Sequence, residues 1–290
     1  MLALGRALSA RRLALAGGAL CAPVRSDTRD GMRTQTMLPK LLAVMLLLAV
    51  AGCVKKTQIR PPYNDLDMAR AVVGAPDRSA DDRTLDAGRH PDQLLAFIGV
   101  RPGMRVAEIG AGLGYTTELL ARAVGRTGVV YGQNNRFIRE KFAEKPWTER
   151  LAKPVMKNVV RVDREFDEPL PPEAKNLDAV IDVMLYHDTV WMKTDRAKMN
   201  RAIFAALKPG GVYVVVDHSG RAGTGTTETE TLHRIEEKVV RTEIEAAGFK
   251  LIADADFLRN PADARDWSAS PRTAGERRGT SDRFVLKFVK

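Results

Sequence analysis

Apolar runs and helix-like repeats alternate along residues 90–290 of the chain. Short runs rich in branched apolar residues, such as 129–130 and 212–216, are typical of strands that are covered on both faces. Between them lie segments with apolar side chains at helical spacing. This alternation of strands and helices predicts a doubly wound α/β fold with a seven-stranded, mostly parallel sheet.

The individual elements follow from the same pattern. Strands are expected at 105–109, 128–131, 158–162, 177–185, 212–216, 249–255 and 283–289. Helices are expected at 66–73, 91–98, 115–124, 137–151 (interrupted near Pro146), 195–207 and 229–247. Residues 76–89 are strongly charged and are predicted to form a loop. Candidates to line the mouth of a cofactor site there are Arg83, Asp86, Arg89 and His90.

The first predicted strand runs into a glycine-rich turn, V-A-E-I-G-A-G-L-G at residues 106–114. Glu108 lies inside the strand, and Gly110, Gly112 and Gly114 follow it. Glycines let the backbone approach a ligand closely, and the next helix directs its free N-terminal amides at the same place. The turn therefore predicts a site for a nucleotide-like small molecule.

The glycine spacing distinguishes two cofactor classes. A dinucleotide fingerprint, G-x-G-x-x-G, requires a glycine at position 115, where this chain has Tyr115. E-x-G-x-G-x-G instead resembles motif I of the class I methyltransferases, which bind S-adenosylmethionine (SAM). The resemblance implies that Glu108, Gly110, Gly112 and Gly114 bind SAM, with the carboxylate near its cationic methionine end.

Further motifs support the resemblance. L-K-P-G-G at 207–211 resembles the turn before the fifth strand of that family, in which the last strand inserts antiparallel between strands five and six. Together with H-P-D-Q-L-L, Y-H-D and D-H-S, these motifs are similar to a group of exported bacterial methyltransferases.

One position departs from the family pattern. After the second strand the family has an acid that binds the ribose hydroxyls, whereas this chain reads Y-G-Q-N-N. Gln133 or Asn134 is expected to accept a ribose hydroxyl through its amide oxygen. The resemblance implies that Asp163, after the third strand, lies near the adenine amino group, and a solvated loop acid is the alternative.

Polar residues follow the fourth and fifth strands, where ligands bind in open parallel sheets. Tyr186, His187 and Asp188 follow the fourth strand, and His218 ends the fifth. We predict that Tyr186 and the two histidines position a methyl acceptor, with His187 or His218 as general base. The alternative is a pair of loop histidines that cap the sheet. No metal is expected, because no H-E-x-x-H or similar spacing occurs.

Two segments near this edge have less specific patterns. The glycine-rich residues 220–227 predict either a lid over the substrate or a linker. His233, Arg234 and Glu237 are expected on a solvated helix face, and the alternative is that they face the mouth of the site.

The formal net charge of +10 is uneven, since seven of the 46 basic residues but only two of the 36 acids lie in residues 1–52. Beyond that segment charges of both signs are interspersed, so nucleic acid is not indicated as a partner. Both cysteines, Cys21 and Cys53, are N-terminal. The rest of the chain therefore has no disulfide, cysteine nucleophile or thiolate metal site.

Residues 37–53 have the basic start, apolar centre and small residues of an export signal. Val50–Cys53 resembles the bacterial lipobox, which implies that Cys53 is lipidated and becomes the mature N-terminus. We expect translation to begin at Met37 (or Met32), residues 1–36 to be a misplaced start, and 54–65 to be a tether before a domain at 66–290. The protein is then expected in the bacterial cell envelope, lipid-anchored to the membrane on the periplasmic side.

These patterns predict SAM-dependent methyl transfer to an acceptor that the sequence does not identify. Because SAM is made in the cytosol, a second hypothesis is a lipoprotein that binds a nucleoside or adenosyl ligand without catalysis. An NAD-dependent dehydrogenase is the third, weakened by Tyr115 at the position of the last fingerprint glycine.

Overall fold

The computed structural model describes residues 65–290. One sheet contains the seven strands β1 (Arg105–Ile109), β2 (Val129–Asn134), β3 (Val159–Asp163), β4 (Leu177–Val183), β5 (Leu207–His218), β6 (Lys250–Ala255) and β7 (Arg283–Val289). The helices are α1 (Asp65–Val73), α2 (Ala80–Arg89), α3 (Pro91–Ile98), α4 (Tyr115–Val124), α5 (Arg136–Ile138), α6 (Glu144–Leu151), α7 (Tyr186–Trp191), α8 (Arg196–Ala206) and α9 (Glu237–Ala246). Shorter turns of other helix types are η1 (Arg139–Ala143), η2 (Pro154–Met156) and η3 (Gly275–Arg277).

The strand order is β3-β2-β1-β4-β5-β7-β6. Neighbouring strands from β3 to β5 are parallel, and β7 is antiparallel to both β5 and β6. The predicted sheet and the inserted last strand are therefore confirmed. The order reverses between β1 and β4, and in open sheets the crevice at the carboxyl ends of such strands is where ligands bind.

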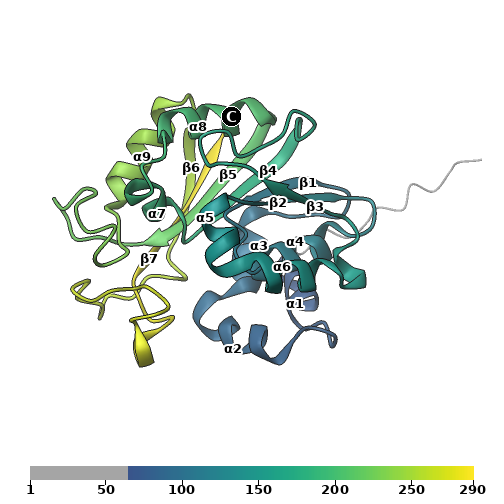
Figure 1. Ribbon diagram of the computed structural model, residues 1–290, viewed down its shortest axis with the longest axis horizontal. Coiled ribbons are helices and arrows are strands. Elements are labelled where there is room, and N and C mark those ends of the chain that lie inside the picture. The colour runs from purple at the N-terminus through teal and green to yellow at the C-terminus, as the bar shows by residue number, and fades with distance from the viewer. Residues whose placement is uncertain (1–64) are drawn as a thin grey trace, which may run out of the picture. The chain divides into compact units, whose positions relative to one another are not determined.

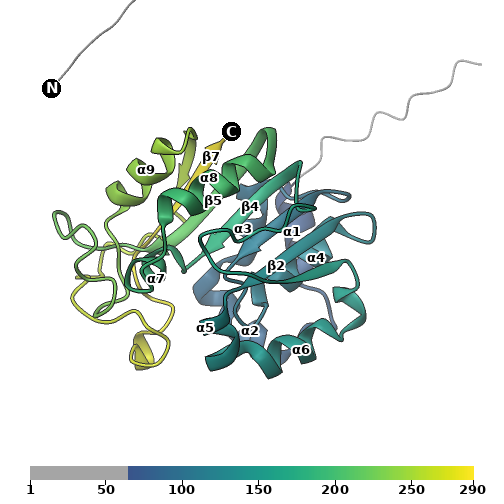
Figure 2. The same ribbon diagram turned by 45° about the horizontal axis from the view of Figure 1, so that its top comes forward.

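Helices cover both faces of the sheet (Figure 1). On one face α1 packs against α3 and α4, and on the other α8 packs against α9, as the turned view in Figure 2 also shows. The central strands are almost entirely buried, as expected for apolar runs between two helical layers. Among residues 65–290, no helix combines the length and the apolar character needed to cross a bilayer.

The charged segment 76–89 is not the predicted loop. Ser79 caps α2 by accepting a hydrogen bond from the Asp82 amide, with acids in the first helical turn. Arg150 of α6 then bonds both Asp82 and Glu118, which docks α2 against α4. The charged side chains of this segment thus form ion pairs between helices. The hydrophobic periodicity of the sequence does not distinguish such a charged helix from a loop.

Other boundaries differ because tertiary contacts override the local pattern. Strand β4 ends at Val183 and α7 follows it, and α9 begins only at Glu237. The L-K-P-G-G segment lies within β5, opposite a register irregularity in β4. The interruption predicted near Pro146 lies earlier, as the π-helical turn Arg139–Ala143, and Pro146 lies in the first turn of α6.

Candidate active site

The glycine loop joins β1 to α4 in a conformation that needs glycine. Gly110, Gly112 and Gly114 have φ values of 68°, 57° and 85°, and Gly114 is the N-cap of α4. A Cβ on Gly114 would overlap the Trp147 ring, and one on Gly110 would overlap Leu185. At Gly112 the nearest atom would be 4.0 Å away, so this position alone leaves room for a ligand over the backbone.

Gln133 and Asn134, at the end of β2, hold this loop. The Gln133 side-chain oxygen accepts a hydrogen bond of 3.0 Å from the Gly110 amide, and the Asn134 oxygen accepts one of 2.8 Å from the Gly112 amide. Asn134 also donates to the Gly112 carbonyl at 3.0 Å. Both side chains are fully buried. Their first role is therefore to fix the loop, and a ribose hydroxyl would use the second lone pair of an oxygen that is already bonded.

Glu108 is a buried carboxyl group directly beneath the loop, with 3% of its surface exposed. Thr117 donates a hydrogen bond to it. Burial raises its pKa to about 7, against the opposing effect of the Thr117 and Thr116 hydroxyls and of the Arg89 and Arg150 charges. Among residues 65–290, neither arginine forms an ion pair with it, so a cationic ligand would compensate its charge.

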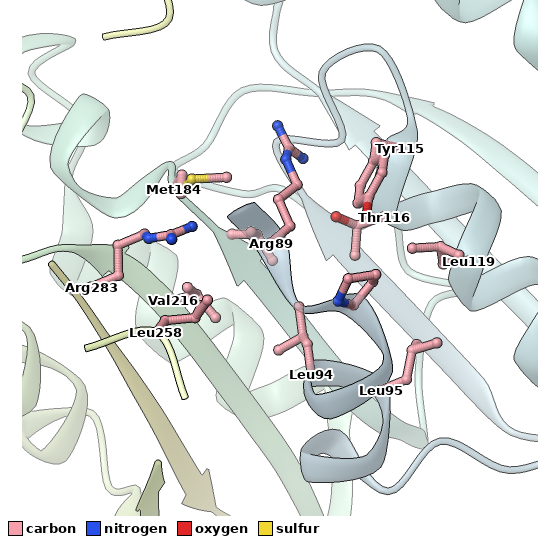
Figure 3. A pocket seen from close by; sticks show the side chains of 12 residues that line it. Arg89, Leu94, Leu95, Tyr115, Thr116, Leu119, Met184, Val216, Leu258 and Arg283 are labelled. Carbon is pink, nitrogen blue, oxygen red and sulfur yellow. The ribbon is translucent and has the colours of Figure 1, made fainter. Parts of the chain in front are cut away.

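A small, largely apolar cavity is lined by Tyr115 and Thr116 at the start of α4 (Figure 3), and Thr116 is also a hydrogen-bond partner of Glu108. Its walls come from α3, from the start of α4 and from the ends of β4, β5 and β7, with Arg89 and Arg283 as the charged lining groups. The Arg89 guanidinium lies 4.5 Å from the centre of the Tyr115 ring. The cavity measures about 10 Å³, close to the space of one water molecule, so a nucleoside-sized ligand requires the lining to open.

Five polar side chains gather beyond the ends of β4 and β5: His187, Asp188, Asp217, His218 and His233. His187 Nδ1 lies 2.6 Å from Asp217 Oδ1. On its other side, His187 Nε2 lies 3.1 Å from Asp188 Oδ1 and 3.2 Å from His233 Nδ1. His233 Nδ1 is itself 3.2 Å from Asp188 Oδ1.

The pKa values of the two predicted catalytic histidines, His187 and His218, are shifted in opposite directions. Burial alone would lower the pKa of His187, but the Asp217 and Asp188 carboxylates raise it to about 10. His218 has no such partner and lies 2.8 Å from the Ser281 hydroxyl through Nδ1. Burial and the neighbouring His187 charge lower its pKa well below the ordinary value. The two carboxylates thus raise the pKa of His187, whereas burial and the His187 charge lower that of its neighbour His218.

The fold and the glycine loop agree with comparisons to known proteins. The protein-L-isoaspartate(D-aspartate) O-methyltransferase family model matches residues 71–159. The ubiquinone/menaquinone biosynthesis C-methyltransferase UbiE of Vibrio vulnificus is 30% identical over 127 residues, which cover 42% of this chain and 44% of that protein. A SAM-dependent methyltransferase from Aquifex aeolicus superposes with a TM-score of 0.51 at 19% identity, over 73% of this chain and 98% of that one.

Residues 65–290 have the class I methyltransferase fold. A further solved chain, a methyltransferase in complex with the Trm112 activator of Haloferax volcanii, agrees with a TM-score of 0.50 at 18% identity and covers 78% of this chain and 95% of that one. The predicted resemblance to the SAM-dependent methyltransferases is thereby confirmed. The chain spans less than half the length of the curated relatives it matches.

Within this methyltransferase fold, two predicted site residues have other partners. Tyr186 was expected to face the acceptor, but it is fully buried and donates a 2.9 Å hydrogen bond to Glu243 of α9, while Asn200 of α8 donates one to it. It joins the helical layer rather than the site. Asp163 ends β3 as predicted, and Arg161 binds its carboxylate at 3.0 Å.

Three residues of the site carried little sequence signal. Arg283 begins β7, and only the antiparallel insertion of that strand pairs it with His218 at the ligand-binding edge. Arg234, predicted on a solvated face, is completely buried and paired with Asp263 at 2.9 Å. His233 is turned toward His187 by a left-handed backbone conformation with φ of 50°. Such contacts between distant residues have no local pattern.

Proposed function

We propose that this chain transfers the methyl group of SAM to an acceptor that enters over the carboxyl ends of β4 and β5. The observation that carries the proposal is Glu108, a buried carboxyl group without an ion-pair partner among residues 65–290, directly under a glycine loop of the family type. SAM carries an ammonium and a sulfonium group, and a carboxylate in a poorly solvated site attracts such cations strongly.

In methyl transfer the protein mainly binds the two reactants and aligns them. When bound, SAM supplies an electrophilic methyl group with a neutral thioether as leaving group. The chain then has to hold the acceptor in line with the methyl carbon and exclude water. Glu108 and the Gly112 backbone orient the cofactor, and the free amides of α4 face the same space. His187 and His218 lie at the acceptor edge.

Access to the site requires a movement of the N-terminal helices. The cavity of about 10 Å³ is closed in part by Arg89 of α2 and by α3. A cofactor of nucleoside size can enter when α2 moves away from Tyr115.

Calorimetric titration of the full chain with SAM, with its demethylated product and with NAD distinguishes the candidates. We expect micromolar binding of SAM and of the product, lost in Glu108→Gln. Glu140→Gln is the matched control, because Glu140 is an exposed glutamate on η1. Binding of NAD alone would favour a dehydrogenase, and no binding of any of the three would favour the non-catalytic protein.

We also propose that lipid at Cys53 tethers the enzyme to the membrane on the periplasmic side of the cell envelope. The support is the V-A-G-C motif after the apolar run; these residues lie outside the described part of the chain. Methyl transfer at the envelope would need SAM on that side, so the anchored protein should be assayed with added SAM.

A further inference from the structure

The cluster beyond β4 and β5 contains a triangle of three ligand-type atoms. Its corners are His187 Nε2, His233 Nδ1 and Asp188 Oδ1, and its edges measure 3.1, 3.2 and 3.2 Å. The three residues come from the start of α7 and from the segment before α9, so the sheet topology brings them together. His187 is buried, whereas the side chains of Asp188 and His233 are 21% and 25% exposed.

Protons cannot satisfy all three edges of this triangle. An ionised carboxylate only accepts, so both ring nitrogens would have to donate to Asp188. The edge between the imidazoles then has two donors and no acceptor, and two N–H groups are held 3.2 Å apart without a hydrogen bond between them. If one nitrogen accepts instead, its lone pair faces the carboxylate oxygen. A cation out of the plane of the triangle, about 2.0–2.1 Å from each corner, satisfies all three atoms at once, because every corner then donates a lone pair to it.

We propose that His187, His233 and Asp188 bind one divalent first-row transition metal ion. Two imidazoles and one carboxylate on one face are a ligand set for such ions. With metal–ligand distances of about 2.0–2.1 Å, neighbouring ligand atoms lie about 2.9 Å apart in octahedral and about 3.3 Å apart in tetrahedral geometry. The observed edges fall between these values, so the ligands are already placed for binding.

The surrounding contacts match those of metal sites. Asp217 Oδ1 lies 2.6 Å from His187 Nδ1, the carboxylate–histidine arrangement that directs the second ring nitrogen at a metal. The Trp191 indole donates a 2.8 Å hydrogen bond to Asp188 Oδ1, which leaves that oxygen a second lone pair. No residue spacing in the sequence indicates this site, because His233 lies 46 positions after His187.

Only three protein atoms form this triangle, so further coordination positions remain for water or another ligand. Val183, Met184 and Val216 line the cavity of Figure 3. Only Leu185 separates Met184 from α7, and Val216 directly precedes Asp217. An acceptor with an oxygen or nitrogen donor could coordinate there. This role rests on the proposed function, whereas binding of the ion does not.

The test is titration of the chelator-treated, tag-free full chain with Zn²⁺ by calorimetry, in the absence of SAM. Co²⁺ is used in parallel, because its visible absorption reports coordination by nitrogen and oxygen. We expect one ion per chain. Asp188→Asn and His233→Asn should each weaken binding by about tenfold or more, since even outer-shell changes weaken metal binding about 10–100-fold. Asparagine tolerates the left-handed conformation at position 233.

His90→Asn is the matched control, because His90 also has a left-handed backbone, with φ of 44°, but caps α2 outside the cluster. It should leave binding unchanged. Thermal melting of each variant checks that the fold is intact. Failure of the wild-type chain to bind either ion, or equal binding by wild type and both cluster variants, overturns the proposal. Either result leaves SAM binding, and hence the proposed function, untouched.

Discussion

The Tyr115 hydroxyl donates a 2.6 Å hydrogen bond to the Asp86 carboxylate. This bond joins the residue directly after the glycine loop to α2, whose Arg89 stacks on the same tyrosine ring. Asp86 is also held by Arg78 at 2.7 Å. The loop expected to bind the cofactor is thus linked to the helix that closes the cavity.

The first prediction concerns this link. Tyr115→Phe removes the hydrogen bond and should loosen α2, so that SAM associates faster in stopped-flow measurements while the free energy of unfolding falls by about 1–2 kcal/mol. Tyr131→Phe is the control, since the Tyr131 hydroxyl bonds Arg105 at the opposite end of the strands. Tyr131→Phe should lose comparable stability without faster association of SAM. Equal association rates for wild type, Tyr115→Phe and Tyr131→Phe would contradict the idea that α2 controls access to the cavity.

The second prediction concerns stability and pH. The pKa of Glu108 is raised to about 7 in the folded chain, above the value of about 4.3 for an unperturbed glutamate. The folded state therefore binds the proton more tightly, and its contribution to stability is complete below pH 4 and is lost as pH rises to about 7. The difference corresponds to about 3–4 kcal/mol. Glu108→Gln should flatten the dependence of the unfolding free energy on pH over this window.

The third prediction concerns cofactor affinity and pH. A cation binds the ionised form of Glu108, so SAM affinity should rise with pH up to about 7 and then level off. Binding near pH 6 should release a proton, which calorimetry in buffers of different ionisation enthalpy detects. If wild type and Glu108→Gln show the same pH dependence, Glu108 does not contact the cofactor cation.

The fourth prediction separates packing from ligand binding in the glycine loop. Gly114→Ala should destabilise the fold by about 3 kcal/mol or more, because strain at φ of 85° adds to overlap with Trp147. Gly112→Ala should lose only about 1–2 kcal/mol, from backbone strain alone. Its SAM affinity should nevertheless fall sharply. Unchanged affinity in a folded Gly112→Ala protein would place the ligand elsewhere.

The fifth prediction concerns the anchor. Cys53→Ala should move the protein from the membrane fraction to the soluble fraction, and mass spectrometry of the wild type should find a lipid-modified N-terminal Cys53. Thr57→Ala is the control, because Thr57 lies in the segment that follows Cys53 and its substitution should leave the fractionation unchanged. A mature protein that retains Arg11 would contradict both the cleavage site and the start at Met37.

The sequence by itself determined the order and type of most elements and the glycine loop with Glu108. Residues 105–109, 115–124 and 283–289 form their predicted elements with the predicted bounds. This information is local, because helical and strand periodicity and the need for glycine at positive φ depend on near neighbours. The exceptions, such as α2, arise where charged residues that resemble a loop form ion pairs with distant helices.

Only the tertiary structure decided what gathers around the site. The triangle of His187, Asp188 and His233 forms because the connection from β5 to α9 folds back over the end of β4. Arg283 reaches the cavity because β7 is antiparallel to β5, which places the start of β7 beside the end of β5. Burial then raises the pKa of Glu108 and lowers that of His218, whereas the Asp217 and Asp188 carboxylates raise that of His187. Each depends on residues far apart along the chain, whose proximity is set by strand order and not by any local repeat.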